Sequence, residues 1–580
     1  MAQHALSIAS DARGYTALVT TAPATTAARS APTVPAPRWL YGPWRDLLFG
    51  CGLWYVTALG AFAFVGPALR AHQGPLWVSF ASLLVLTPHY GATLLRVYEQ
   101  REDRRAYALF AVHATLLLVA LFAAAVYVPL VAAAVFTLYV SWSPWHYSGQ
   151  NFGIAAMMLR RRGVALEGSL RRWLHTSFVL SYALTLLALH TGARASDVAP
   201  VGPATAAVRF LSLDLDPRIG EPLFAATALA YAAAVGVAVA RLLRRASLVD
   251  ALPTLALVAT QALWFSVPLA LRRFGVRTGF EPWESSEGAY YFLWIATAHG
   301  LQYLWVTAYY AGVGRSGASP ASWRYFAKVL LAGAMVWTLP ALVFAPGLLG
   351  RLPYDGGLAV LVASIVNLHH FVLDGVVWKL RDGRVARILL RPRGDRAAAG
   401  ATSSPRVARA VWVVGLACFA LLLGAEFQTN IVLRRAQASG DVGALGAGLD
   451  RLREVGRDSA RWRVVLAGAL DRRGDEAGAL REYERALALQ EQPSTWQLVA
   501  ALHARRGEWS RVASALERAV ALQPDLENAQ FELGRALLKL GRAGEAEQAF
   551  ARAAEINPDR RINTIMRERA RAEAARIETP

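Results

Sequence analysis

The chain has 580 residues, of which 55% are hydrophobic and only 18% are charged, and it contains 18 tryptophans. This composition excludes an ordinary soluble multidomain protein and indicates a membrane protein with many spanning segments. The net charge of +20 arises from basic residues clustered between apolar stretches, a pattern of cytoplasmic loops that argues against nucleic-acid binding. The two cysteines, Cys51 and Cys418, exclude a disulfide framework and a cysteine-based zinc site.

The N-terminal segment, residues 1–38, is rich in Ala, Thr and Pro and lacks the apolar core of a signal peptide, so it is predicted to be a disordered tail. Residues 39–430 are predicted to form a transmembrane helical bundle. A spanning helix needs roughly 20 apolar residues. About eleven segments reach that length: 46–69, 75–96, 106–128, 130–158, 173–191, 221–241, 250–271, 289–312, 325–346, 356–380 and 407–425.

The loop charges predict how this bundle is oriented. Basic clusters at 101–105, 160–172, 241–245 and 379–396 each follow an even-numbered segment. The positive-inside rule places these loops and the N-terminus in the cytoplasm, although the cluster at 271–277 runs against it. An odd number of helices then puts the C-terminal part on the other side, the periplasm of a bacterium whose inner membrane holds the bundle.

The C-terminal part contains an internal repeat. Residues 431–456 are predicted to be a linker or helix, and 457–580 a repeat domain. Its three units share a glycine, a large apolar residue nine positions later and an alanine twelve positions later. These are Gly474, Gly507 and Gly541, then Tyr483, Leu516 and Phe550, then Ala486, Ala519 and Ala553.

This pattern resembles the tetratricopeptide repeat (TPR), a helix pair repeated every 34 residues or so. The resemblance implies an α-solenoid of about three units that binds a protein or peptide, with residues 560–577 as the capping helix. The predicted fold class is therefore all-α, a transmembrane bundle followed by a solenoid.

Five histidines lie in apolar segments beside other polar residues: His89, His146, His299, His369 and His370. In the predicted topology their four helices run in the same direction, and each histidine lies about 10 to 16 residues from the outer end. At 1.5 Å per residue these depths are similar, so the imidazoles can form one cluster. His72, His113, His175 and His190 lack such neighbours and serve as an internal comparison.

Helical spacing adds supporting groups on the same helix faces. Gln150 follows His146 by four residues, Gln302 follows His299 by three, and Asp374 follows His370 by four. Neutral imidazoles beside a carboxylate suit iron, zinc or copper. We predict that the five histidines supply the metal ligands and that Asp374, Tyr147, Gln150 and Gln302 are the catalytic residues. Two other readings remain: polar side chains that hold helices together, and a proton or ion pathway.

Two of these stretches, "SPWHYSGQNFG" and "YYFLWIATAHGLQYLW", resemble segments of the Brp/Blh membrane family of carotene-cleaving dioxygenases, whose iron is held by intramembrane histidines. The resemblance implies that His146, His299, one of His369 and His370, and His89 are iron ligands. It also implies a carotenoid as the type of substrate.

The sequence thus predicts a non-haem iron oxidoreductase that acts on a lipid, polyprenoid or carotenoid dissolved in the bilayer and recruits a protein through its repeats. Whether the protein is an enzyme stays open, because two alternatives remain. One is a membrane-anchored TPR scaffold without catalysis. The other is a glycosyltransferase using lipid-linked sugars, although its expected acidic first external loop is "RAHQGP" (70–75) here, leaving Glu281, Glu284 and Glu287 to substitute.

Overall fold

The computed structural model describes residues 38–58, 82–99, 107–192, 208–276, 288–316, 323–346, 348–378, 383–390 and 405–578. These described residues are helical, apart from turns and two isolated β-bridges. The predicted all-α class is therefore confirmed for them. The predicted disordered tail lies outside the described residues, except for Arg38.

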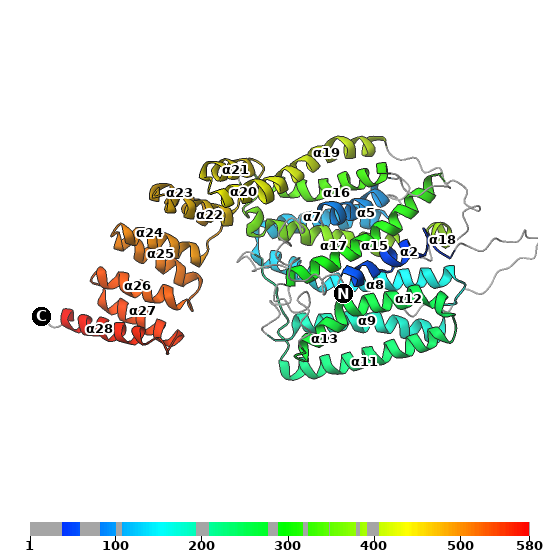
Figure 1. Cartoon of the computed structure of the whole chain (residues 1–580), viewed down its shortest axis with the longest axis horizontal. Coiled ribbons are helices and arrows are strands. Elements are labelled where there is room, and N and C mark those ends of the chain that lie inside the picture. Colours follow the sequence, from blue (N-terminus) through cyan, green and yellow to red (C-terminus); the bar gives the residue numbers. More distant parts are fainter. Residues whose placement is uncertain are drawn as a thin grey trace, which may run out of the picture.

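The first half of the chain is a bundle of long helices that lie side by side (Figure 1). Its long α-helices are α5 (Thr87–Tyr98), α7 (Thr115–Tyr127), α8 (Pro129–Arg161), α9 (Gly168–His190), α11 (Pro217–Leu243), α12 (Leu248–Gln261), α15 (Gly288–Ser316), α16 (Trp323–Val343), α17 (Ala359–Val377) and α19 (Pro405–Phe427). Its shorter α-helices are α2 (Pro43–Arg45), α13 (Val267–Arg273) and α18 (Gly383–Leu390). π-Helical turns extend several of these at Asp46–Gly50, Ser82–Leu86, Leu109–Ala114, Ala262–Ser266, Tyr354–Leu358 and Gln428–Val432.

Seven helices among the described residues are long and apolar enough to cross a membrane: Leu109–Tyr127, Gly168–His190, Pro217–Leu243, Leu248–Arg273, Trp323–Val343, Tyr354–Val377 and Pro405–Ser439. Helix α8 is long enough with 33 residues, but the polar stretch "SWSPWHYSGQN" in its middle lowers its mean hydropathy. The predicted number of eleven spanning helices therefore stays a prediction. Ten of the predicted segments contain a helix among their described residues, whereas the first, 46–69, is interrupted at Cys51 and Gly52.

Two glycines let helices α5 and α16 touch along their backbones. A Cβ atom built on Gly91 of α5 would lie 1.8 Å from the carbonyl oxygen of Val329, and one built on Gly333 of α16 would lie 1.8 Å from that of Thr87. Only glycine fits at such a contact, because the clash is with backbone rather than with a movable side chain. This close packing fixes the position of α5, which carries His89.

The basic cluster that runs against the positive-inside rule has a local partner. Arg273, at the end of α13, forms an ion pair with Glu221 near the start of α11, with 2.5 Å between Nη2 and Oε1. The ion pair joins the end of α13 to the start of α11.

The second half consists of paired helices: α22 (Ala460–Arg472) with α23 (Glu476–Leu489), α24 (Pro493–Arg505) with α25 (Trp509–Leu522), and α26 (Glu527–Lys539) with α27 (Ala543–Ile556). Helix α28 (Arg561–Glu578) follows the third pair and packs on α27. The repeated glycines have positive φ angles of 82°, 71° and 73° and end the first helix of each pair. The repeated alanines and the residues Tyr483, Leu516 and Phe550 are at most 3% exposed. The three predicted repeat units are thus present.

The segment predicted as a linker or helix, 431–456, forms another helix pair, α20 (Leu433–Ser439) and α21 (Val442–Glu454). Gly440 separates the two helices with a φ of 68° and lies 34 residues before Gly474. Helix α19 continues through a π-helical turn directly into α20. The repeats therefore extend from one end of the bundle without a loose linker (Figure 1).

Candidate metal centre

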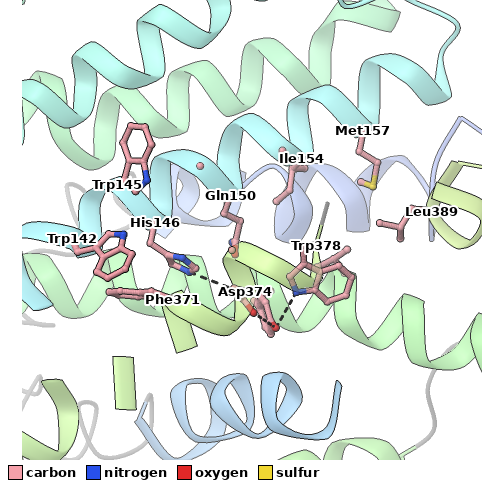
Figure 2. A pocket seen from close by; sticks show the side chains of 15 residues that line it. Trp142, Trp145, His146, Gln150, Ile154, Met157, Phe371, Asp374, Trp378 and Leu389 are labelled. Carbon is pink, nitrogen blue, oxygen red and sulfur yellow. Dashed lines mark hydrogen bonds and ion pairs between the residues drawn. The ribbon is translucent and has the colours of Figure 1, made fainter. Parts of the chain in front are cut away.

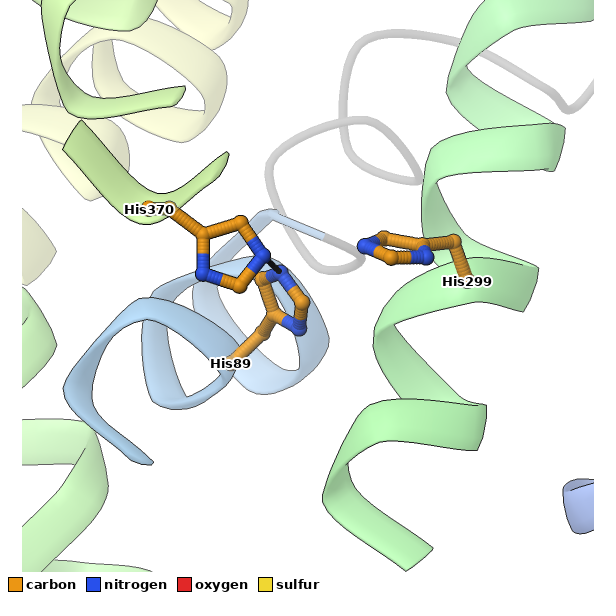
Figure 3. A group of neighbouring side chains, drawn as sticks. All are labelled: His89, His299 and His370. Atoms are coloured by element: carbon orange, nitrogen blue, oxygen red, sulfur yellow. Dashed lines mark hydrogen bonds between the residues drawn. The ribbon is translucent and has the colours of Figure 1, made fainter. Parts of the chain in front are cut away.

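Four imidazoles from four helices meet in the core of the bundle. His89 comes from α5, His146 from α8, His299 from α15 and His370 from α17. Ring centroids lie 4.3 Å apart for His89 and His370, 4.8 Å for His89 and His299, and 4.9 Å for His146 and His370. Figure 3 shows His89, His299 and His370 converging. These three side chains are buried, with 1–2% exposure.

Asp374 lies one turn after His370 on α17 and completes the cluster. Its Oδ2 atom is 3.5 Å from His370 Nε2 and 3.9 Å from His146 Nε2. The possible ligand atoms form two groups that share His370: His89, His299 and His370, and His146, His370 and Asp374. Within each group the atoms lie within 4.8 Å of one another. Two nitrogens bound to one ion at about 2.1 Å are separated by up to about 4.2 Å, so both groups are close to ligand spacing.

Several imidazole nitrogens of this cluster lack ordinary partners, although His89 Nε2 lies 2.9 Å from His370 Nε2. Among the described residues, no hydrogen bond reaches His89 Nδ1, His146 Nε2 or either ring nitrogen of His299, and all four atoms are buried. Such a group costs about 1–3 kcal/mol when it is left unsatisfied. Each neutral imidazole offers one lone pair, so His89, His146 and His299 can each direct one nitrogen to a cation. Three histidines with unsatisfied nitrogens at one place fit a bound cation better than a cluster that only holds helices together.

A chain of hydrogen bonds holds His370 and Asp374 from behind. His370 Nδ1 lies 2.8 Å from Thr93 Oγ1, which donates to the Tyr303 hydroxyl at 2.7 Å. Tyr303 donates in turn to Asp374 Oδ1 at 2.7 Å, and Trp378 Nε1 donates to the Tyr303 oxygen at 3.1 Å. With a proton on Nδ1 the donor directions agree along the whole chain. With Nδ1 protonated, His370 Nε2 carries a lone pair and lies 2.9 Å from His89 Nε2, and Asp374 Oδ2 faces the same space. Both atoms therefore offer lone pairs toward the cluster, as metal ligands require.

Aromatic rings enclose the imidazoles. Phe371 stacks on His146 with 4.4 Å between ring centroids, and the ring of Tyr147 lies 4.2 Å from that of His299. Tyr303 packs edge-on against His89 at 4.6 Å. These walls keep water from most of the cluster and fix the rotamers of its histidines.

The other predicted site residues lie at different distances from this centre. His369 points elsewhere: its Nε2 is 2.9 Å from Thr115 Oγ1 and 3.3 Å from the Tyr98 hydroxyl. Consecutive residues on a helix point about 100° apart, so only one of the two adjacent histidines can face the cluster. His370 is that residue.

The two predicted glutamines belong mainly to a neighbouring network. Gln150 donates to the carbonyl oxygen of His299 at 3.3 Å and to Gln302 Oε1 at 3.0 Å. Gln302 donates to Asn151 Oδ1 at 3.0 Å and to the Gly50 carbonyl at 3.3 Å. Gln150 therefore touches the edge of the site, whereas Gln302 joins helices next to it.

The comparison histidines lie apart from the cluster. His113 and His175 are exposed. His190 is bonded to Ser141 Oγ at 3.0 Å and accepts the backbone N–H of Leu213 at 3.1 Å. His72, the loop 70–75 and the acidic residues Glu281, Glu284 and Glu287 lie outside the described residues.

Three residues with clear contacts in the structure were not predicted from the sequence: Thr93, Trp378 and Asp46. Thr93 follows His89 by four residues, the same spacing that drew attention to Gln150 and Asp374, so its signal was present. Trp378 has the same spacing from Asp374. Asp46 is fully buried and accepts from the backbone N–H of Leu40 at 2.6 Å and from Trp305 Nε1 at 2.9 Å. It fastens the start of the bundle to α15.

Comparison with known proteins bears on the second half of the chain. Residues 503–568 match the family model described as tetratricopeptide repeat. No curated protein matches the chain. The matched residues run from the end of α24 into α28, so the repeats form a protein-interaction domain of the TPR type.

Proposed function

We propose that the helical bundle is a metal-dependent oxidoreductase of the bacterial inner membrane, with non-haem iron as its cofactor and an apolar molecule as its substrate. The observation that carries this proposal is the cluster of buried, unpartnered imidazole nitrogens beside the Asp374 carboxylate. His89, His146, His299 and His370 would hold the ion together with Asp374.

The donor set favours iron over the other candidate metals. His146, His370 and Asp374 form a group of two imidazoles and one carboxylate, a set typical of non-haem iron in oxygenases. Iron bound there would supply one-electron chemistry with dioxygen as the oxidant. Zinc and copper also bind imidazole, so the identity of the metal is part of the test below.

The residues of this chain have distinct tasks in the proposal. Thr93 and Tyr303 hold His370 and Asp374 in their orientations and keep the proton of His370 on Nδ1. Phe371 and Tyr147 pack against imidazoles and limit the access of water. Each of these roles follows from the contacts described above.

Membrane insertion is supported by the seven long apolar helices and by the basic clusters between them. The repeats begin at the end of the bundle where α17 begins: Ser459 Oγ donates to Asp355 at 2.6 Å, and the Arg457 guanidinium lies 4.0 Å from the centre of the Tyr354 ring. In the predicted topology this is the outer end. We therefore place the TPR domain, and the protein that it recruits, in the periplasm.

Elemental analysis of the detergent-purified full chain tests this function. We compare the wild type with a triple variant, His146→Ala, His299→Ala, His370→Ala, and with a control double variant, His113→Ala, His175→Ala, that removes two exposed histidines. The proposal expects about one iron per chain in the wild type and the control and almost none in the triple variant.

A folded triple variant that keeps its metal, or a wild type that binds none from iron-supplemented medium, would overturn the proposal. If the triple variant does not fold, the single substitution His299→Gln replaces it. A metal-free outcome leaves the scaffold as the function, with the imidazoles serving only to hold the helices together.

A further inference from the structure

A pocket of about 340 Å³ lies beside the proposed centre, between α8, α15, α17 and α18. This is within the usual range of ligand pockets, about 300–1,000 Å³. Figure 2 shows its side chains in a row, from Trp142 and Trp145 at one end to Met157 and Leu389 at the other, with His146 near the first two tryptophans and Asp374 between the ends. His89 and His299 do not line it. The centre therefore meets the pocket through His146 and Asp374.

One face of α8 forms the length of this pocket. Trp142, His146, Gly149, Gly153 and Met157 recur every three or four residues and all line it. From Trp142 to Met157 this face is about 22 Å long, at 1.5 Å per residue. A pocket of this length with so modest a volume is slender.

Glycines keep the groove open. A Cβ atom built on Gly149, Gly153 or Gly375 would meet no atom within 4 Å, so larger side chains at these positions would point into free space. Gly149 and Gly375 are exposed, and Trp145 beside them is 42% exposed. The groove is thus accessible from the side of the bundle, between α8 and α17.

The lining chemistry defines the ligand. Indole rings, Phe371 and aliphatic side chains make up most of the wall, and the polar atoms come from His146, Gln150, Tyr303 and Asp374 near the centre. Among the described residues that line the pocket, those at the far end, Met157 and Leu389, carry no charge. A ligand must therefore be apolar over most of its length.

We infer that this groove binds one slender hydrocarbon chain, whose end reaches Met157 and Leu389 while carbons near its other end lie beside His146 and Asp374. From His146 the groove extends about 16 Å toward Met157 but only about 6 Å toward Trp142. The chain is therefore presented to the centre near one of its ends. Only the reaction of the hydrocarbon chain at the metal centre rests on the proposed function; the binding of the hydrocarbon chain in the groove does not.

Photo-crosslinking tests the inference. The probe is hexadecanol with a diazirine at its terminal carbon, added to the detergent-purified full chain. Peptides crosslinked by the probe are then identified by mass spectrometry. We expect crosslinks to the peptides that contain Met157 and Leu389. Crosslinks spread evenly over the outward apolar faces of the bundle, as on α11 and α19, would overturn the inference.

A blocking variant adds a second measurement. In Gly153→Leu the new side chain projects into the groove, so crosslinking should fall at least about tenfold, equivalent to about 1.4 kcal/mol of binding free energy. The matched control is Gly236→Leu on α11, where a built Cβ also meets nothing within 4 Å but which does not line this pocket. Equal crosslinking of the two variants would contradict the inference.

The same experiment separates this inference from the proposed metal function. Gly153 supplies no ligand, so the metal content of Gly153→Leu should equal that of the wild type. If the hydrocarbon probe crosslinks in the groove but the protein binds no metal, the groove is supported and the proposed metal function is wrong. If metal is bound and the groove is not labelled, the metal function stands and the present inference fails.

Discussion

The substitution Thr93→Val tests the metal centre without touching any proposed ligand. Valine has nearly the shape of threonine but lacks the hydroxyl that connects His370 Nδ1, at 2.8 Å, with Tyr303, at 2.7 Å. The imidazole then loses the acceptor that keeps its proton on Nδ1 and leaves a lone pair on Nε2 for the metal. The buried N–H is also left unsatisfied, at a cost of about 1–3 kcal/mol.

The expected magnitude follows from two independent arguments. Loss of a group that orients a metal ligand lowers metal affinity about 10- to 100-fold in known sites. Since each factor of ten corresponds to about 1.4 kcal/mol, this range agrees with the cost of the unsatisfied N–H. We therefore expect Thr93→Val to weaken iron binding by one to two powers of ten, as measured anaerobically by competition with a chelator of known affinity.

Thr254→Val is the matched control. Thr254 is fully buried in α12, and its hydroxyl has no hydrogen-bond partner among the described residues. Removing this hydroxyl should leave metal affinity unchanged and stability equal or slightly higher. An unchanged affinity in folded Thr93→Val, or an equal loss in both variants, would refute the role assigned to the hydrogen-bond chain.

Three further results are expected. Gly91→Ala should lower the melting temperature strongly, because the new Cβ would lie 1.8 Å from the Val329 carbonyl oxygen. The control Gly424→Ala should not lower it, because a Cβ built on Gly424 meets no atom within 4 Å. Equal melting temperatures of the two variants would contradict the close packing of α5 and α16. Removal of iron by a chelator should destabilise the wild type by about 2.7 kcal/mol, relative to a solution that contains iron at 100 times its dissociation constant. A melting temperature that is the same with and without iron would argue against the site. The hydrogen bond between His503 Nδ1 and Glu508 Oε2, 2.6 Å long, lowers the pKa of Glu508 in the folded protein. The Glu508 carboxylate therefore stabilises the repeats at pH values above its unfolded pKa of about 4.3. This contribution is lost as the pH falls through the lower pKa of the folded state. Hydrogen exchange in the full chain should show stronger protection of α24 and α25 in the wild type than in Glu508→Gln, and this difference should decrease as the pH is lowered. A difference in protection that does not change with pH would rule out the Glu508 carboxylate as its cause.

The helices of the bundle could be predicted from the sequence because long apolar helices leave a clear signal in local hydropathy. Apart from 46–69, which is interrupted at Cys51 and Gly52, each predicted segment contains a helix, and the predicted boundaries fall within a few residues of the observed ones wherever the structure describes them. The polar middle of α8 shows the limit of hydropathy alone. Its histidine and neighbouring polar residues reduce the apolar signal at the place where the site is built.

The candidate site could be predicted at the level of helices but not of side-chain directions. Matched depths along four parallel helices placed His89, His146 and His299 at one level, and the structure brings these three together with His370. Whether His369 or His370 faces inward depends on the rotation of α17 about its axis. That rotation is set by packing against α5, α7 and α8, which no local pattern records.

The same limit explains the two glutamines. Gln150 and Gln302 were both chosen because they share a helix face with a histidine, yet a face is broad enough to contact two neighbouring helices. Gln302 turns toward Asn151 and Gly50, and Gln150 lies between both regions. Thr93 was overlooked although it shares a face with His89, because a threonine in an apolar helix usually bonds to its own backbone.

The junction between the halves shows what a repeat pattern reveals and what it leaves out. Gly440 continues the glycine spacing of the repeats by one more unit, so the helix pair at 433–454 could be predicted from the sequence, although 431–456 was predicted only as a linker or helix. The contacts of Ser459 with Asp355 and of Arg457 with Tyr354 join positions about 100 residues apart, and such pairs leave no local signal. Arg457 also forms an ion pair with Glu426 at the end of α19. The repeats are therefore attached to the bundle at two helices: α19, which continues into them, and the start of α17, the helix that carries His370 and Asp374.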